Sequence, residues 1–87
     1  MSAPEDTDVP TTVRQIVARV GRLDPDRVAD ADSFADDLGI DSLGKLELVV
    51  QVERAFGLRF DDDQAASVAT VGSVVDVVRQ LQVGRGR

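Results

Sequence analysis

The clearest helix signal in this chain of 87 residues is the segment Leu38-Gly-Ile-Asp-Ser-Leu-Gly-Lys-Leu-Glu-Leu-Val-Val-Gln-Val-Glu-Arg-Ala-Phe56. Asp41 is a favourable N-cap, because its carboxylate can accept hydrogen bonds from the first free backbone N–H groups of a helix. Gly57 can adopt the left-handed conformation that often ends a helix. We therefore expect a helix over Ser42–Phe56 that begins directly at a serine.

This expected helix has two unlike faces. Successive residues turn by about 100°, so most of its apolar side chains fall on one broad face that can be buried. Leu43 and Val50 fall on the opposite face beside Glu47, which leaves two apolar residues at solvent-facing positions next to an acid. Such a strip is suited to binding a partner protein. The expected buried face contains Leu46, Leu48, Val49, Val52, Ala55 and Phe56.

The sequence before this segment predicts one further helix, from about Thr12 to Gly21. Thr12 and Gln15 have the spacing of a capping box, and Gly21 suits a C-cap. Residues 1–10 contain two prolines and three acids and are expected to form a flexible tail. The expected buried stripe of this helix is Val13, Ile16, Val17 and Val20.

The sequence after the central segment predicts two more helices. A short helix begins at Asp61, whose side chain can cap toward Gln64, and it ends near Ser67. The last helix begins after Thr70, and residues 84–87 are expected to form a second flexible tail. The buried stripe of the last helix is expected to be Val71, Val74, Val75, Val78 and Leu81.

These elements predict an all-α fold, because no alternating strand pattern or hairpin dipeptide occurs. The expected architecture is a four-helix bundle with a short third helix and a long loop, residues 22–41, between the first two helices. Phe34 and Leu38 are expected to pin this loop to the core. The folded domain is then residues 11–83.

Composition limits the chemistry that the chain can perform. It has no cysteine and no histidine, which excludes disulfides, thiol catalysis and cysteine-ligated zinc and removes the usual general base near neutral pH. Ser42 lacks the glycine spacing of a hydrolase motif, and the acidic run from Asp30 lacks the ligand spacing of a calcium loop. No apolar stretch is long enough to span a membrane. We expect a monomeric, cytoplasmic protein with no catalytic residue and no metal site.

The net charge of −6 is concentrated in the middle of the chain. Residues 24–63 carry twelve acidic and four basic side chains. This field repels nucleic acid and anionic lipid, and it attracts basic surfaces on other proteins.

Ser42 is the residue best placed to carry chemistry. It lies in the first turn of the expected helix, where free backbone N–H groups and the positive end of the helix dipole favour an anionic substituent such as a phosphate ester. The alternative interpretation is that Asp41 and Ser42 are simply favourable helix-start residues.

The motif around Ser42 closely resembles that of the acyl carrier proteins. The resemblance rests on the stretch Asp32-Ser-Phe-Ala-Asp-Asp-Leu-Gly-Ile-Asp-Ser-Leu43, followed by Glu47-Leu-Val-Val50, Glu53 and Phe56. It continues through Thr70-Val71 and the last helix, and covers about residues 11–83.

The resemblance implies that Ser42 receives a 4′-phosphopantetheine arm from coenzyme A, transferred by a phosphopantetheinyl transferase with Mg²⁺. The thiol of that arm would hold acyl groups as thioesters for enzymes of fatty-acid, polyketide or lipopeptide biosynthesis, so the protein would be a substrate of enzymes rather than an enzyme. Positions that match the family's docking residues for basic partner surfaces are Asp41, Leu43, Glu47, Val50 and Glu53. Positions that match the core into which some carriers fold the acyl chain are Phe34, Leu46, Val49, Val52, Phe60, Ala65 and Val68.

Four residues depart from the pattern of fatty-acid carriers and favour a specialised pathway: Gly44, Lys45, Arg54 and Ala55. The two basic side chains offset Glu47 and Glu53, so the expected docking helix is only mildly negative. Two alternatives remain open at this point. One is a peptidyl or aminoacyl carrier that uses the same serine, and the other is a non-catalytic helical adaptor that binds a partner without a prosthetic group.

Overall fold

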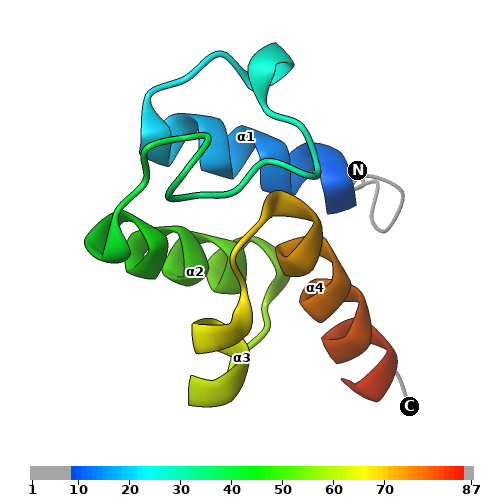
Figure 1. Cartoon of the computed structure of the whole chain (residues 1–87). Helices are drawn as coiled ribbons and strands as arrows, with labels where there is room; N and C mark the ends of the chain where they lie inside the picture. Colours follow the sequence, from blue (N-terminus) through cyan, green and yellow to red (C-terminus); the bar gives the residue numbers. More distant parts are fainter. Residues whose placement is uncertain (1–8, 86–87) are drawn as a thin grey trace.

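The computed structural model describes residues 9–85 of the chain and places four α-helices there (Figure 1). A single 3₁₀ turn, η2, lies in the long connection after the first helix. Within residues 9–85 the β-type pairing is limited to one isolated bridge between Ser33 and Thr70, so the prediction of an all-α bundle with a short third helix is confirmed. The elements are α1 Val9–Gly21, η2 Pro25–Arg27, α2 Ser42–Phe56, α3 Asp62–Ser67 and α4 Val71–Arg85.

Helix α1 is the centre of the bundle, because it packs against both α2 and α4. Figure 1 shows α2 running antiparallel to α1, with α4 to the right of α2 in this view. The core between the helices is aliphatic except for Phe34 and Phe60, as expected of a chain with three phenylalanines and no tyrosine or tryptophan. Its fully buried members include Val13, Val17, Leu48, Val52, Val71, Val74 and Val78.

The start of α1 lies earlier than the sequence predicts. The helix begins at Val9, whose side chain is 0% exposed and joins the core. The expected flexible tail is therefore wrong for residues 9 and 10, and Thr12 lies inside the helix instead of capping it. Residues 1–8 of that expected tail lie outside the described residues. At the other end, α4 continues to Arg85 and includes the first two residues of the expected C-terminal tail, whose last two residues are not described.

The end of α1 also differs from the prediction. Gly21 is the last helical residue, and Arg22 takes the left-handed conformation with a φ of 59°. A Cβ at Gly21 would lie 3.1 Å from Leu23 Cδ1 and 3.3 Å from Ile40 Cδ1. Gly21 thus serves close packing against the long connection, and Arg22 makes the turn.

The long connection between α1 and α2 is held by backbone hydrogen bonds to the start of α4. The Phe34 N–H donates to the Ala69 carbonyl (2.9 Å), and the Gly72 N–H donates to the Asp30 carbonyl (2.8 Å). A third bond joins the Val71 N–H to the Asp32 carbonyl. We call these three bonds the loop clamp. They fix the connection next to a helix some forty residues later in the sequence.

Side chains complete the attachment of this connection. Phe34 is buried and Leu38 packs partly buried against the core, as predicted. The Ile40 N–H donates to the Phe34 carbonyl (2.7 Å), so the chain folds back on itself just before α2. At α3, Asp61 and Gln64 form the capping box that gives the short helix its start.

Gly44 allows α2 to approach the long connection closely. A Cβ at Gly44 would lie 2.9 Å from Ile40 Cγ2, and Ile40 is buried. A glycine at this position costs roughly 1 kcal/mol of helix propensity relative to alanine. Its lack of a Cβ leaves room for the Ile40 side chain.

We predict that Gly44→Ala destabilises the protein by about 1 kcal/mol, because overpacking costs roughly 1–3 kcal/mol and exceeds the gain in helix propensity. In an Ile40→Ala background, which removes Cγ2, the same change is expected to be neutral or stabilising. Urea unfolding of the four variants measures both values as a double-mutant cycle. If the single change Gly44→Ala raised the free energy of unfolding, the proposed close packing of Gly44 against Ile40 would be contradicted.

Candidate functional site around Ser42

Ser42 is exposed at the first position of α2, on the outer surface of the bundle. Asp41 is the N-cap, as predicted, and its Oδ1 accepts a hydrogen bond from the Gly44 N–H (2.8 Å). Among the described residues, no acceptor takes the backbone N–H of Ser42 or of Leu43. The serine hydroxyl therefore lies at the electropositive end of a helix of 15 residues with free donors next to it.

The segment before Ser42 is rigidly placed although it is not helical. Gly39 has a φ of 67°, which turns the chain toward the buried Ile40. Ser33 and Asp37 bond reciprocally: the Asp37 carboxylate accepts from the Ser33 N–H (2.8 Å), and the Ser33 carbonyl accepts from the Asp37 N–H (3.0 Å). Ser42 is the first residue of α2, and the loop clamp ties the segment before it to the start of α4.

A shallow depression of about 360 Å³ adjoins Ser42. It is open to solvent, and its apolar lining includes Phe34 and Ile40. Lys45 adds a positive charge at its edge. An elongated, flexible group with a phosphate at its attachment point fits these features, because the phosphate would meet the helix start and Lys45 while the rest follows the apolar lining.

Lys45 has a structural role that its sequence does not suggest. Its Nζ donates to the Ala66 carbonyl (3.2 Å), close to the C-terminal end of α3. A cation at that end interacts favourably with the free carbonyl groups of the helix. Lys45 thus joins α3 to the first turn of α2, next to the serine.

The apolar strip on α2 is larger than predicted. Leu43, Leu46 and Val50 are 73%, 59% and 40% exposed, and their spacing of three and four residues places them along one line of the helix. We call these three residues the α2 strip. The prediction that Leu46 is buried is therefore wrong, and so is the same prediction for Ala55. The reason is that the buried arc of α2 is narrow and centred on Leu48, Val49 and Val52.

Glu53 is positioned by an internal contact. Its Oε2 accepts a hydrogen bond from the Phe60 N–H at 2.8 Å, and the side chain is partly buried. Because Phe60 is itself buried, this carboxylate satisfies a backbone donor that water reaches poorly. Glu53 therefore holds the connection between α2 and α3, whereas Asp41, Leu43, Glu47 and Val50 are exposed.

The candidate acyl-pocket residues do not form one group. Apart from the exposed Leu46, the set lies in or against the core, with Ala65 only partly buried. Phe34 alone among them lines the depression next to Ser42. The buried members of the set are Phe34, Val49, Val52, Phe60 and Val68.

Fold and site together define a small helical domain that presents one serine at a helix start and offers a mixed apolar and charged surface beside it. None of the helices in residues 9–85 is both long and apolar enough to cross a lipid bilayer. The same residues contain no cluster of three or more side chains that could hold a metal ion.

Comparison with known proteins identifies this class. The family described as "Phosphopantetheine attachment site" matches residues 11–78. The acyl carrier protein of Sinorhizobium fredii and the acyl carrier protein AcpP of Rhizobium meliloti are each 40% identical over 76 residues, covering 87% of this chain and 97% of the relative. The solved structure of an acyl carrier protein from Enterococcus faecalis, described for its high thermal stability, matches with a TM-score of 0.72 and 31% identity, covering 86% of this chain and 95% of that one.

The chain belongs to the acyl carrier protein family, and its prosthetic group is 4′-phosphopantetheine. Members of this family are carrier proteins that work with enzymes of acyl metabolism and with a phosphopantetheinyl transferase.

We predict that Glu53→Ala lowers the free energy of unfolding by about 1–3 kcal/mol, because it leaves the buried Phe60 N–H without an acceptor. Glu53→Gln should retain most of the stability, since an amide oxygen can accept the same bond. Urea unfolding measures these values, with the exposed Glu47→Ala as the matched control, expected to change stability by about 0.5 kcal/mol or less. Equal stability of Glu53→Ala and wild type would show that the bond contributes nothing.

Proposed function

We propose that Ser42 is the attachment residue for 4′-phosphopantetheine and that this chain delivers acyl thioesters between enzymes of a specialised biosynthetic pathway. The observation that carries the proposal is the position of Ser42, exposed at the first turn of a capped helix inside the Asp-Ser-Leu motif. In this proposal the carrier is loaded and used in the cytoplasm, where biosynthetic enzymes draw on coenzyme A.

The attachment is a phosphoryl transfer to the serine oxygen. Ser42 Oγ forms a bond to the phosphorus that carries the pantetheine, the bond from that phosphorus to the adenosine bisphosphate breaks, and adenosine 3′,5′-bisphosphate leaves. The hydroxyl proton goes to a base of the transferase, because the described part of this chain offers no histidine near Ser42. When bound, the group supplies a terminal thiol that holds acyl groups as thioesters.

The chain's own residues support this use in three ways. The free N–H groups of Ser42 and Leu43 and the ammonium of Lys45 favour a negative phosphodiester at the helix start. The Phe34 and Ile40 side chains offer apolar contact for the arm. The α2 strip and the acidic side chains near Ser42 suit enzymes with basic and apolar docking surfaces.

The charge pattern of α2 supports a specialised pathway over general fatty-acid synthesis. Glu53 is engaged with the Phe60 N–H, so Glu47 is the acid left exposed on the body of the helix. Arg54 is exposed on the same helix. A partner whose basic surface suits a uniformly acidic helix would find a weaker electrostatic potential of mixed sign on α2.

Incubating the protein with coenzyme A, Mg²⁺ and a phosphopantetheinyl transferase should add the mass of one phosphopantetheine. Ser42→Ala should abolish the gain, whereas Ser67→Ala, an exposed serine on α3, should retain it. Intact-mass spectrometry measures the product. Modification of the Ser42→Ala variant, or no modification of wild type by several transferases, would refute the assignment.

The same modified protein tests the cargo and the pathway. We expect acyl donors to load the arm and aminoacyl donors to leave it unloaded. We also expect a fatty-acid ketosynthase to extend the acyl group on this protein more slowly than it extends the same group on a fatty-acid carrier measured in parallel. Equal extension rates would argue for fatty-acid synthesis and against the specialised role.

A further inference from the structure

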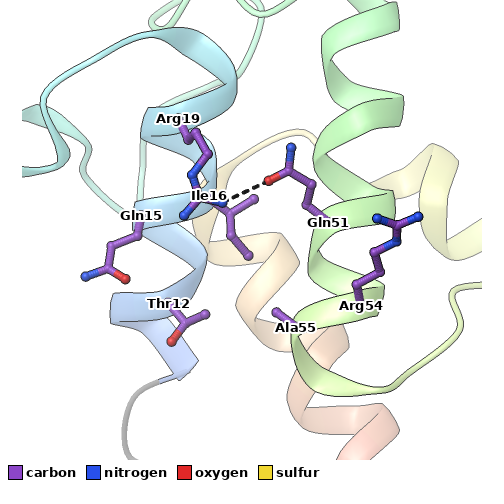
Figure 2. Close-up of a pocket in the computed structure, with 7 residues that line it drawn as sticks. All are labelled: Thr12, Gln15, Ile16, Arg19, Gln51, Arg54 and Ala55. Atoms are coloured by element: carbon purple, nitrogen blue, oxygen red, sulfur yellow. Dashed lines mark hydrogen bonds between the residues drawn. The ribbon is translucent and has the colours of Figure 1, made fainter.

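A groove of about 540 Å³ lies between α1 and α2 (Figure 2). It shares no lining residue with the depression next to Ser42. Its α1 side consists of four residues at helical spacing, so it is one continuous face of that helix. Its α2 side consists of three residues near the end of the helix. The lining residues are Thr12, Gln15, Ile16 and Arg19 from α1, and Gln51, Arg54 and Ala55 from α2.

The groove is positively charged in a chain whose net charge is −6. Two of its lining residues are arginines and none is acidic. Over the part of the chain that the structure describes, neither Arg19 nor Arg54 forms an ion pair; the ion pair found there joins Arg14 to Asp30. The groove therefore concentrates cationic charge that the protein itself does not neutralise.

The two arginines retain most of their hydrogen-bonding capacity. Arg19 Nη1 donates to Gln51 Oε1 at 3.2 Å, and Figure 2 shows these two side chains meeting across the groove. Gln51 in turn donates to the exposed Glu47 carboxylate at 3.3 Å. Since a guanidinium group has five N–H donors, Arg19 and Arg54 can each still form a bidentate pair with a carboxylate.

The groove is also continuous with the surface expected to meet partner enzymes. Arg54 lies four residues after Val50, the last member of the α2 strip. Along the axis of α2, Arg54 is roughly 18 Å from Ser42 at 1.5 Å per residue. An interface of ordinary size, about 800 Å² on each partner, covers that distance.

We propose that the α1–α2 groove binds an acidic segment of a partner enzyme, so that Arg19 and Arg54 pair with its carboxylates while basic residues of the same enzyme face Asp41 and the other acids near Ser42. This inference rests on the proposed carrier function, since the partner is an enzyme that acts on the loaded arm. The docking surface is then bipolar: negative at the serine end of α2 and positive at its far end. A bipolar surface fixes the orientation of the partner and discriminates against enzymes that are basic throughout.

The test uses the full-length protein labelled with ¹⁵N and a hexaglutamate peptide at low ionic strength. We expect the peptide to shift the side-chain N–H signals of Arg19 and Arg54 and the amide signals of the groove. The double variant Arg19→Gln/Arg54→Gln should bind the peptide at least about tenfold more weakly, which corresponds to roughly 1.4 kcal/mol. Arg59→Gln/Arg79→Gln is the matched control, because it removes two exposed charges outside the groove and should leave the affinity unchanged.

Four results would overturn the proposal. Equal shifts at all exposed arginines would indicate a diffuse ionic effect, and equal shifts with inorganic phosphate would indicate a simple anion site. Groove shifts that depend on protein concentration without peptide would indicate a second copy of this chain. Transfer of phosphopantetheine to Ser42 is measured separately by mass. A wild-type protein that is modified at Ser42 but does not bind the peptide in the groove would reject this inference and leave the carrier function standing.

Discussion

The structure depends on the loop clamp, the three backbone hydrogen bonds that hold the long connection against the start of α4. A connection of about twenty residues with only a single 3₁₀ turn is costly in conformational entropy unless its polar backbone groups find partners. The Phe34 N–H and the Asp30 carbonyl find theirs at Ala69 and Gly72. With the connection fixed, Phe34 and Ile40 can be buried, and the chain enters α2 at one defined position.

That position gives Ser42 its properties. Because Ile40 is seated against Gly44 and Asp41 caps the helix, the serine is exposed while its neighbours are held. In the proposed function, the Ser42 hydroxyl needs access to a transferase, and the arm attached to it needs freedom to reach several enzymes. A rigid base under an exposed residue satisfies both requirements, and the rest of the small core serves to keep that base in place.

Much of this could be predicted from sequence because it is local. The cap at Asp41, the stop at Gly57, the cap at Asp61 and the fold class all follow from short-range patterns, and the structure confirms them. The start of α1 at Val9 could not be predicted, since proline and acidic residues near a helix start resemble a tail in composition.

Contacts between distant residues explain what the sequence did not reveal. The spacing of Leu46 is compatible with burial, yet the arc of α2 that faces α1 is too narrow to include it. The role of Lys45 depends on the position of α3, and the role of Glu53 depends on the path of the connection that brings the Phe60 N–H back to α2; helix patterns in the sequence give neither. The charge summed over the sequence of α2 therefore differs from the charge that its exposed side chains carry. Only the exposed charges can contact a partner.

Amide hydrogen exchange tests whether the clamped connection holds the otherwise free start of α2. We expect the Phe34, Ile40 and Gly72 amides to exchange only through openings whose free energy approaches that of global unfolding, and the Ser42 and Leu43 amides to exchange rapidly. Rapid exchange at Phe34 and Gly72 in a protein whose helical amides remain protected would give the opposite result. The connection before Ser42 would then not be held by the loop clamp.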